Sequence, residues 1–136
     1  MTNLNPYISF RDNARAALDF YHELLGGDLV VSSFADGGMQ VEPAEANLVM
    51  HGQVTGPTGL VLMAADTPSH MEYSPGTNIQ VSLSGTDEDE LRGYWDKLTS
   101  DGGTVTVPFE RAPWGDMFGM AVDRFGIHWL LNASAA

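Results

Sequence analysis

Residues 5–27 read NPYISFRDNARAALDFYHELLGG and predict a short strand that leads directly into a helix. Apolar and polar side chains alternate over residues 5–10, a pattern typical of a strand with one buried face. Apolar side chains recur at helical spacing over residues 13–25, and the two glycines that follow end the helix because glycine tolerates a left-handed cap. We expect the Asp12 side chain to cap the start of this helix.

A second strand and helix repeat this pattern further along the chain. Residues 78–83 alternate as residues 5–10 do, and apolar spacing predicts a helix over residues 87–100. Thr86 and Asp89 resemble a capping box at the start of that helix. A repeat of this size sets the architecture, because each copy is one supersecondary unit.

Three strand-like runs follow each of the two helices. They are expected at residues 28–34, 47–54, 59–65, 103–109, 117–123 and 127–132. The order is therefore β-α-β-β-β, twice, which predicts an α+β fold made of two tandem modules. The first module covers about residues 1–65, a turn-rich connector covers 66–76, and the second module covers about 77–136. We expect one domain over residues 1–136, because neither module would bury a full core alone.

Composition excludes several classes of function. The chain of 136 residues contains no cysteine, so disulfides, thiolate zinc sites and cysteine nucleophiles are absent. Its net charge of −12 opposes nucleic-acid binding and would attract a cationic ligand. No apolar run is long enough to cross a membrane, and the N-terminus lacks a signal pattern, so we expect a cytoplasmic protein with no membrane partner.

Longer stretches of the sequence resemble the vicinal oxygen chelate superfamily, which includes glyoxalases, bleomycin resistance proteins and ring-cleaving dioxygenases. PYISFRDNARAALDFYHELLGG over residues 6–27 looks like the opening of the PhnB-like branch of that superfamily. LVMHGQV over residues 48–54 and PWGDMFGMAVDRFGIHWLLN over residues 113–132 resemble its third strand and its ending. The resemblance implies curved sheets of mixed strand direction, a cupped cavity, and a homodimer.

Many members of the superfamily bind a divalent metal through side chains on the first, fourth, fifth and eighth strands. Carried over to this sequence, the corresponding positions hold Asn5, Asn78 and Leu130, while the fourth strand offers only Asp66 just past its end. A catalytic metal needs about three protein ligands. We therefore expect no cofactor, with a divalent metal as the alternative.

Alternation along the strands points to a polar face with a candidate binding site. The expected ligand-binding residues share short polar or aromatic side chains and are Tyr7, Ser9, His51, Asn78, Gln80 and Trp114. The leading interpretation is non-catalytic binding of a small organic molecule, such as an antibiotic or another cationic or aromatic natural product.

Two enzymatic alternatives remain open at this point. One is a metal-dependent lyase, isomerase or dioxygenase with a displaced site that uses His51, for which a pair with His128 would still need a carboxylate such as Asp116 or Glu42. The other is a metal-free enzyme in which His51 is the general base and Asp116 or Tyr7 assists. The residues alone name neither the ligand nor the reaction.

Overall fold

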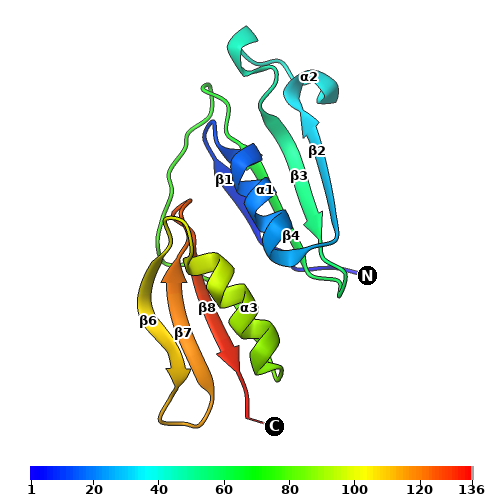
Figure 1. Ribbon diagram of the computed structural model, residues 1–136. Helices are drawn as coiled ribbons and strands as arrows, with labels where there is room; N and C mark the ends of the chain where they lie inside the picture. Colours follow the sequence, from blue (N-terminus) through cyan, green and yellow to red (C-terminus); the bar gives the residue numbers. More distant parts are fainter. Residues whose placement is uncertain (136) are drawn as a thin grey trace. The chain divides into compact units, whose positions relative to one another are not determined.

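The computed structural model describes residues 1–135, and the chain divides into two compact units, Met1–Pro75 and Gly76–Ala136. The elements of the first unit are β1 (Tyr7–Phe10), α1 (Ala14–Leu25), β2 (Asp28–Ser33), α2 (Phe34–Gly37), the 3-10 turn η1 (Pro43–Glu45), β3 (Val49–Thr55) and β4 (Val61–Asp66) (Figure 1). Those of the second unit are β5 (Val81–Gly85), α3 (Glu88–Thr99), β6 (Thr104–Arg111), β7 (Met117–Val122) and β8 (His128–Ala133).

The two units repeat one topology. The first sheet has the order β1-β4-β3-β2 and the second has the order β5-β8-β7-β6. In each sheet the first strand runs parallel to the fourth, and the remaining pairs are antiparallel. The prediction of an α+β fold built from two tandem β-α-β-β-β modules is confirmed, whereas the cupped cavity stays a prediction.

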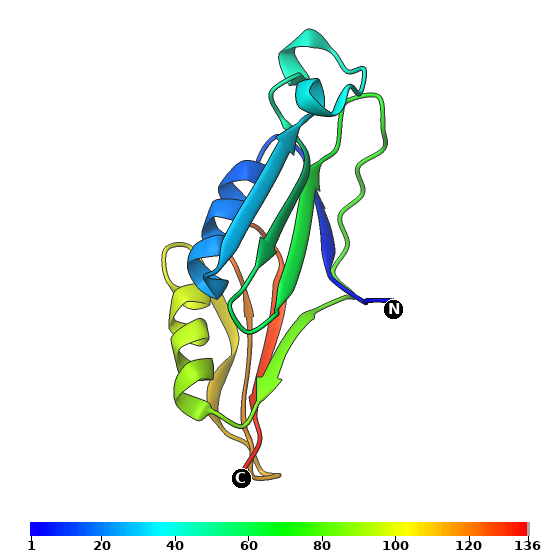
Figure 2. The same cartoon turned by 90° about the vertical axis from the view of Figure 1, so that its right-hand side faces the viewer.

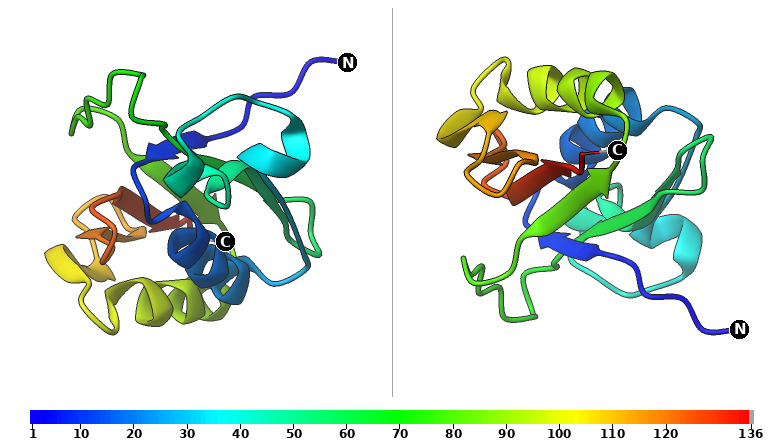
Figure 3. Two further views of the ribbon diagram at one scale, coloured as in Figure 1. Left: turned by 90° about the horizontal axis from the view of Figure 1, so that it is seen from above. Right: turned by 90° about the horizontal axis from the view of Figure 1, so that it is seen from below.

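In the first unit, α1 covers one face of its own sheet (Figures 2 and 3). A Cβ atom added to Gly52 of β3 would lie 2.2 Å from Leu18 Cδ1 of α1, so helix and strand are in close contact at this point. The core that they enclose is apolar and includes Phe10, Leu18, Tyr21, Val54 and Leu62. The opposite side of the sheet, turned away from the helix, is called its open face below.

The second unit is built in the same way around α3. A Cβ atom added to Gly119 of β7 would lie 2.9 Å from Trp95 Cη2 of α3. Trp95 stacks on Phe109 of β6 with ring centroids 5.5 Å apart, and Trp129 is buried on the same side of the sheet. Side chains that alternate with these therefore form the open face of the second sheet.

The start of α1 differs from its prediction. Asp12 does not cap the helix, because it adopts a φ of 71° and Asn13 is the N-cap residue, without a side-chain hydrogen bond. The free N–H of Ala14 instead donates to Asp66 Oδ1 of β4 at 3.0 Å. The helix is thus anchored by a carboxylate from a distant strand.

Two boundaries in the second unit also differ from expectation. The N-cap of α3 is Asp87, whose Oδ1 accepts from Glu90 N at 3.1 Å, and not Thr86. β5 begins at Val81, which pairs with Trp129 of its parallel partner β8. Within the described part of the chain, no helix is long and apolar enough to cross a membrane.

The segment that leaves β4 is bound to the first unit. Arg11 Nη2 donates to the carbonyl oxygen of Met71 at 2.6 Å, and its guanidinium lies 5.2 Å from the centre of the Tyr73 ring. The Glu45 carboxylate accepts hydrogen bonds from both the N–H and the hydroxyl of Ser69, each at 2.9 Å. The connector is therefore ordered by specific contacts as far as Tyr73.

Candidate functional site

The open face of the first sheet gathers three of the residues predicted for the site. Tyr7 and Ser9 alternate on β1 with the core-facing Ile8 and Phe10, and His51 precedes Gly52, which faces α1. The strand register places Tyr7 beside Met63 of β4. Tyr7, Ser9 and His51 therefore lie on one surface.

Tyr7 and His51 are in direct contact on this surface. The Tyr7 hydroxyl lies 3.2 Å from His51 Nδ1, and the ring centroids are 5.6 Å apart. Burial raises the pKa of Tyr7 above its ordinary value, so the phenol stays protonated near neutral pH. When the phenol donates this bond, Nδ1 is the acceptor and Nε2 carries the imidazole proton, available to a bound molecule.

Two further residues beside Tyr7 and His51 on the open face were not selected from the sequence. Gln53 lies on the same side of β3 as His51 and donates to Thr55 Oγ1 at 3.1 Å, while Met63 is its neighbour on β4. Gln53 could have been selected from the sequence, because it lies two residues after His51 on the same strand and so shares its face. Met63 had no such signal, because its place beside Tyr7 depends on the register between two strands.

Both carboxylate oxygens of Asp66 accept structural hydrogen bonds, so Asp66 is not available to a metal. It is only 5% exposed, and its two carboxylate oxygens accept from Ala14 N and Val49 N, each at 3.0 Å. Among residues 1–135 no group of three or more His, Asp or Glu side chains is arranged to hold a metal ion. The residues present therefore do not fit a metal at the positions that the resemblance implies.

The other three predicted site residues belong to the second unit. Trp114 lies in the loop between β6 and β7, is 62% exposed, and meets Phe118 edge to face with ring centroids 5.3 Å apart. Asn78 and Gln80 are exposed but precede β5, so the prediction that they line a strand is wrong. Phe118 is half-buried on the open face rather than in the core beside Trp129.

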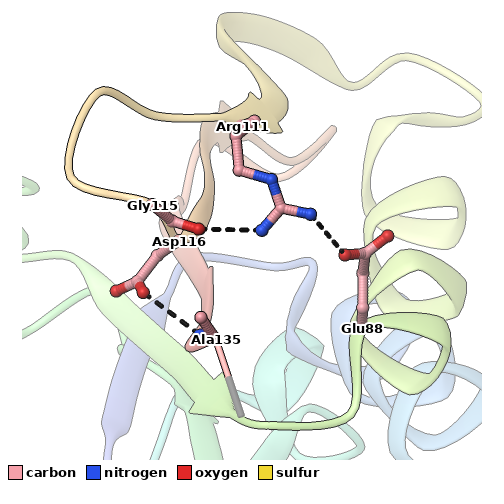
Figure 4. A network of polar contacts seen from close by, with 5 residues as sticks. All are labelled: Glu88, Arg111, Gly115, Asp116 and Ala135. Atoms are coloured by element: carbon pink, nitrogen blue, oxygen red, sulfur yellow. Dashed lines mark hydrogen bonds and ion pairs between the residues drawn. The ribbon is translucent and has the colours of Figure 1, made fainter.

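Asp116 and Arg111, which flank the same loop, are held in a polar network (Figure 4). Arg111 Nη1 donates to Gly115 O at 2.8 Å and Nη2 lies 3.4 Å from Glu88 Oε1. The Asp116 carboxylate accepts from Ala135 N at 3.3 Å and from Asn132 Nδ2 at 3.1 Å. His51 and Asp116 stand in different units, and each has its own partners.

Comparison with known proteins gives consistent relatives over nearly the whole chain. Residues 3–131 match the family described as the glyoxalase/bleomycin resistance protein/dioxygenase superfamily. The crystal structure of protein PA1353 from Pseudomonas aeruginosa is similar at 30% identity and a TM-score of 0.84, with 100% of both chains covered. Protein YjdN from Escherichia coli is 25% identical, and the match covers 95% of this chain and 93% of that one.

A more distant structure shares the fold. It is a Bacillus cereus protein described as a putative 3-demethylubiquinone-9 3-methyltransferase, PhnB protein, with 21% identity and a TM-score of 0.78. The match covers 98% of this chain and 100% of that chain.

Proposed function

Because the chain belongs to the glyoxalase/bleomycin resistance protein/dioxygenase superfamily, we propose that it binds a small organic molecule without a metal at the superfamily's usual positions. The observation that carries this proposal is the open face of the first sheet, where Tyr7 and His51 lie in contact beside Ser9, Gln53 and Met63. A few fixed polar groups among apolar ones are typical of sites for organic ligands. We also propose a homodimer as its state, and the PhnB-like branch as its place in the superfamily.

The polar and apolar groups of this open face determine which chemical groups a ligand needs in order to bind it. The His51 Nε2–H donates to an acceptor on the ligand, and Tyr7, a residue that is 50% exposed, supplies apolar contact through its ring. None of the open-face residues paired along β1 to β4 is Lys or Arg. The ligand is therefore neutral or cationic, which agrees with a net charge of −12.

A titration followed by NMR tests binding at this face. A set of aromatic, amphipathic and cationic natural products is added to the 15N-labelled full-length chain, freed of metal by a chelator. We expect shifts centred on Tyr7, His51 and Gln53. His51→Gln should weaken binding at least tenfold, because the donor to the ligand changes and its contact with Tyr7 is lost.

His70→Gln is the matched control, since His70 is an exposed histidine of the connector. It should leave the affinity within about twofold, the size of an average surface substitution. Equal losses in both histidine variants, or shifts that avoid the first sheet, would contradict the proposal.

A metal-free acid–base enzyme is the second candidate, favoured by the 3.2 Å contact between the Tyr7 hydroxyl and His51 Nδ1. In that case His51 accepts a proton from the substrate and Tyr7 orients the imidazole. Turnover of any ligand found by NMR, lost in His51→Gln and in Tyr7→Phe but kept in His70→Gln, would favour this candidate over simple binding.

A further inference from the structure

An exposed tryptophan is held in a fixed place on the second unit. Trp114 packs edge to face against Phe118, which anchors the indole on the open face of its sheet. Large aromatic side chains that stay exposed at a defined position are enriched at binding sites, where they dominate the binding free energy. The Trp114 ring is therefore a candidate contact for a ligand.

The loop that carries the indole is ordered before any ligand arrives. Arg111 donates to the carbonyl of Gly115 at 2.8 Å, and the Asp116 carboxylate accepts from the N–H of Ala135, just past β8 (Figure 4). Asp116 also accepts from the side-chain amide of Asn132 in β8. A preordered loop loses little conformational entropy on binding. The loop therefore presents the indole as a preformed surface.

A row of paired residues that includes Phe118 crosses the open face. The register places Glu110 of β6 opposite Phe118, Phe118 opposite Asn132, and Asn132 opposite Ser84. Glu110 is exposed and takes the side of the sheet opposite to Arg111, because neighbouring residues of a strand alternate. The row thus joins an aromatic pair to a carboxylate.

No lysine or arginine is paired beside that carboxylate on the open face. None of the open-face residues paired along β5 to β8 is Lys or Arg. The arginines of this unit are engaged elsewhere: Arg111 with Glu88, Arg124 with Asp101 at 2.5 Å, and Arg92 over the Phe109 ring at 4.7 Å. An anionic ligand would meet no lysine or arginine among the paired residues of this face.

From this arrangement we infer that the open face of the second sheet binds the cationic head of an organic ligand, an ammonium or quaternary ammonium carried on an apolar body. The Trp114 ring faces the cation, Glu110 supplies the opposing charge, and Phe118 with Met120 contacts the apolar body. A cation over an indole is attracted by the ring quadrupole, most strongly among the aromatic side chains. The inference rests on the proposed function and names the ligand class for a second surface.

Two probes of similar size and opposite charge test the inference. The full-length chain is titrated with benzyltrimethylammonium and with benzenesulfonate, and the indole N–H signal of Trp114 is followed by NMR. We expect the cation alone to shift this signal, and its affinity to fall as salt is raised, since exposed charges are screened.

Three variants test the roles proposed for Glu110 and Trp114, with Asp96 as the control. Glu110→Gln should weaken benzyltrimethylammonium binding about fivefold, while Asp96→Asn, which removes one exposed charge from α3, should change it less than twofold. Trp114→Leu keeps an apolar side chain but removes the ring. It should weaken benzyltrimethylammonium binding about tenfold or more.

Equal effects of the two acid variants would mean attraction by net charge alone and would overturn the inference. Equal binding of benzenesulfonate, or no shift at Trp114 with either probe, would overturn it as well. The proposed function fails separately, because it is judged on the Tyr7, His51 and Gln53 signals with the natural-product set.

Discussion

At the scale of single residues, Asp66 shows how the first unit uses a carboxylate inside its core. One oxygen binds the first N–H of α1 and the other binds the first N–H of β3. Both bonds are charge-assisted and buried, and such bonds are stronger than neutral ones. Asp66 therefore ties a helix, and the strand that carries His51, to the end of β4.

Replacing Asp66 should destabilise the protein strongly. Asp66→Ala leaves two buried N–H groups without an acceptor, and we expect the free energy of unfolding to fall by about 3 kcal/mol. Asp66→Asn keeps one acceptor and should lose about half as much. Urea denaturation measures both, with the exposed Asp96→Asn as control. A loss below about 1 kcal/mol for Asp66→Ala would contradict the assigned role.

Tyr7 should titrate above the ordinary range of tyrosine. Burial disfavours the phenolate, so the pKa in the folded state lies above that in the unfolded state. The resulting stabilisation is present below pH 10, the ordinary value, and is lost as the pH rises through the folded-state pKa. Absorbance titration at 295 nm of the wild type minus Tyr7→Phe isolates this group. A midpoint at or below pH 10 would contradict the burial.

At the scale of elements, two glycines near α3 differ in their packing. Gly93 belongs to the helix itself, whereas Gly119 lies on the strand that faces it. A Cβ atom at Gly93, on the outer side of α3, would meet no atom within 4 Å. At Gly119 of β7 the same atom would lie 2.8 Å from Phe109 Cα, a backbone atom, and 2.9 Å from Trp95 Cη2. Only the second glycine is required by packing.

Alanine at these two positions should shift stability in opposite directions. Gly93→Ala should stabilise by about 0.5–1 kcal/mol, because alanine restricts the unfolded chain and favours the helix. Gly119→Ala should destabilise by about 1–3 kcal/mol, because strand and helix must move apart. Thermal unfolding of the two variants beside the wild type checks this. A stable Gly119→Ala variant would show that α3 packs more loosely than the structure has it.

Elements were predictable from the sequence where the signal is local. Within residues 1–135, the eight strands and the two long helices lie within a few residues of the positions that alternation and helical spacing indicate. The cap of α1 was not predictable, because its acceptor Asp66 lies far away in the sequence from Ala14. β5 pairs with β8 only from Val81 onward, so the place of Asn78 and Gln80 before the strand also depends on pairing with a distant partner.

At the scale of the whole molecule, the internal repeat predicted the architecture but not the distribution of chemistry. The first open face carries a tyrosine–histidine contact, whereas the second carries an aromatic pair with a neighbouring carboxylate. His51 was found from its strand position, and Tyr7 from alternation. Their contact across β4 depends on register, which a single sequence does not encode locally.

We propose that this chain binds its ligand without a metal at the superfamily's positions. The most direct measurement is the metal content per chain, by mass spectrometry, after incubation with Mn, Fe, Ni and Zn and removal of free ions, paired with the unfolding temperature. We predict no stoichiometric metal and no thermal shift, because a ligand that binds the native state must stabilise it. One tightly held ion per chain with a clear rise in unfolding temperature would contradict the account.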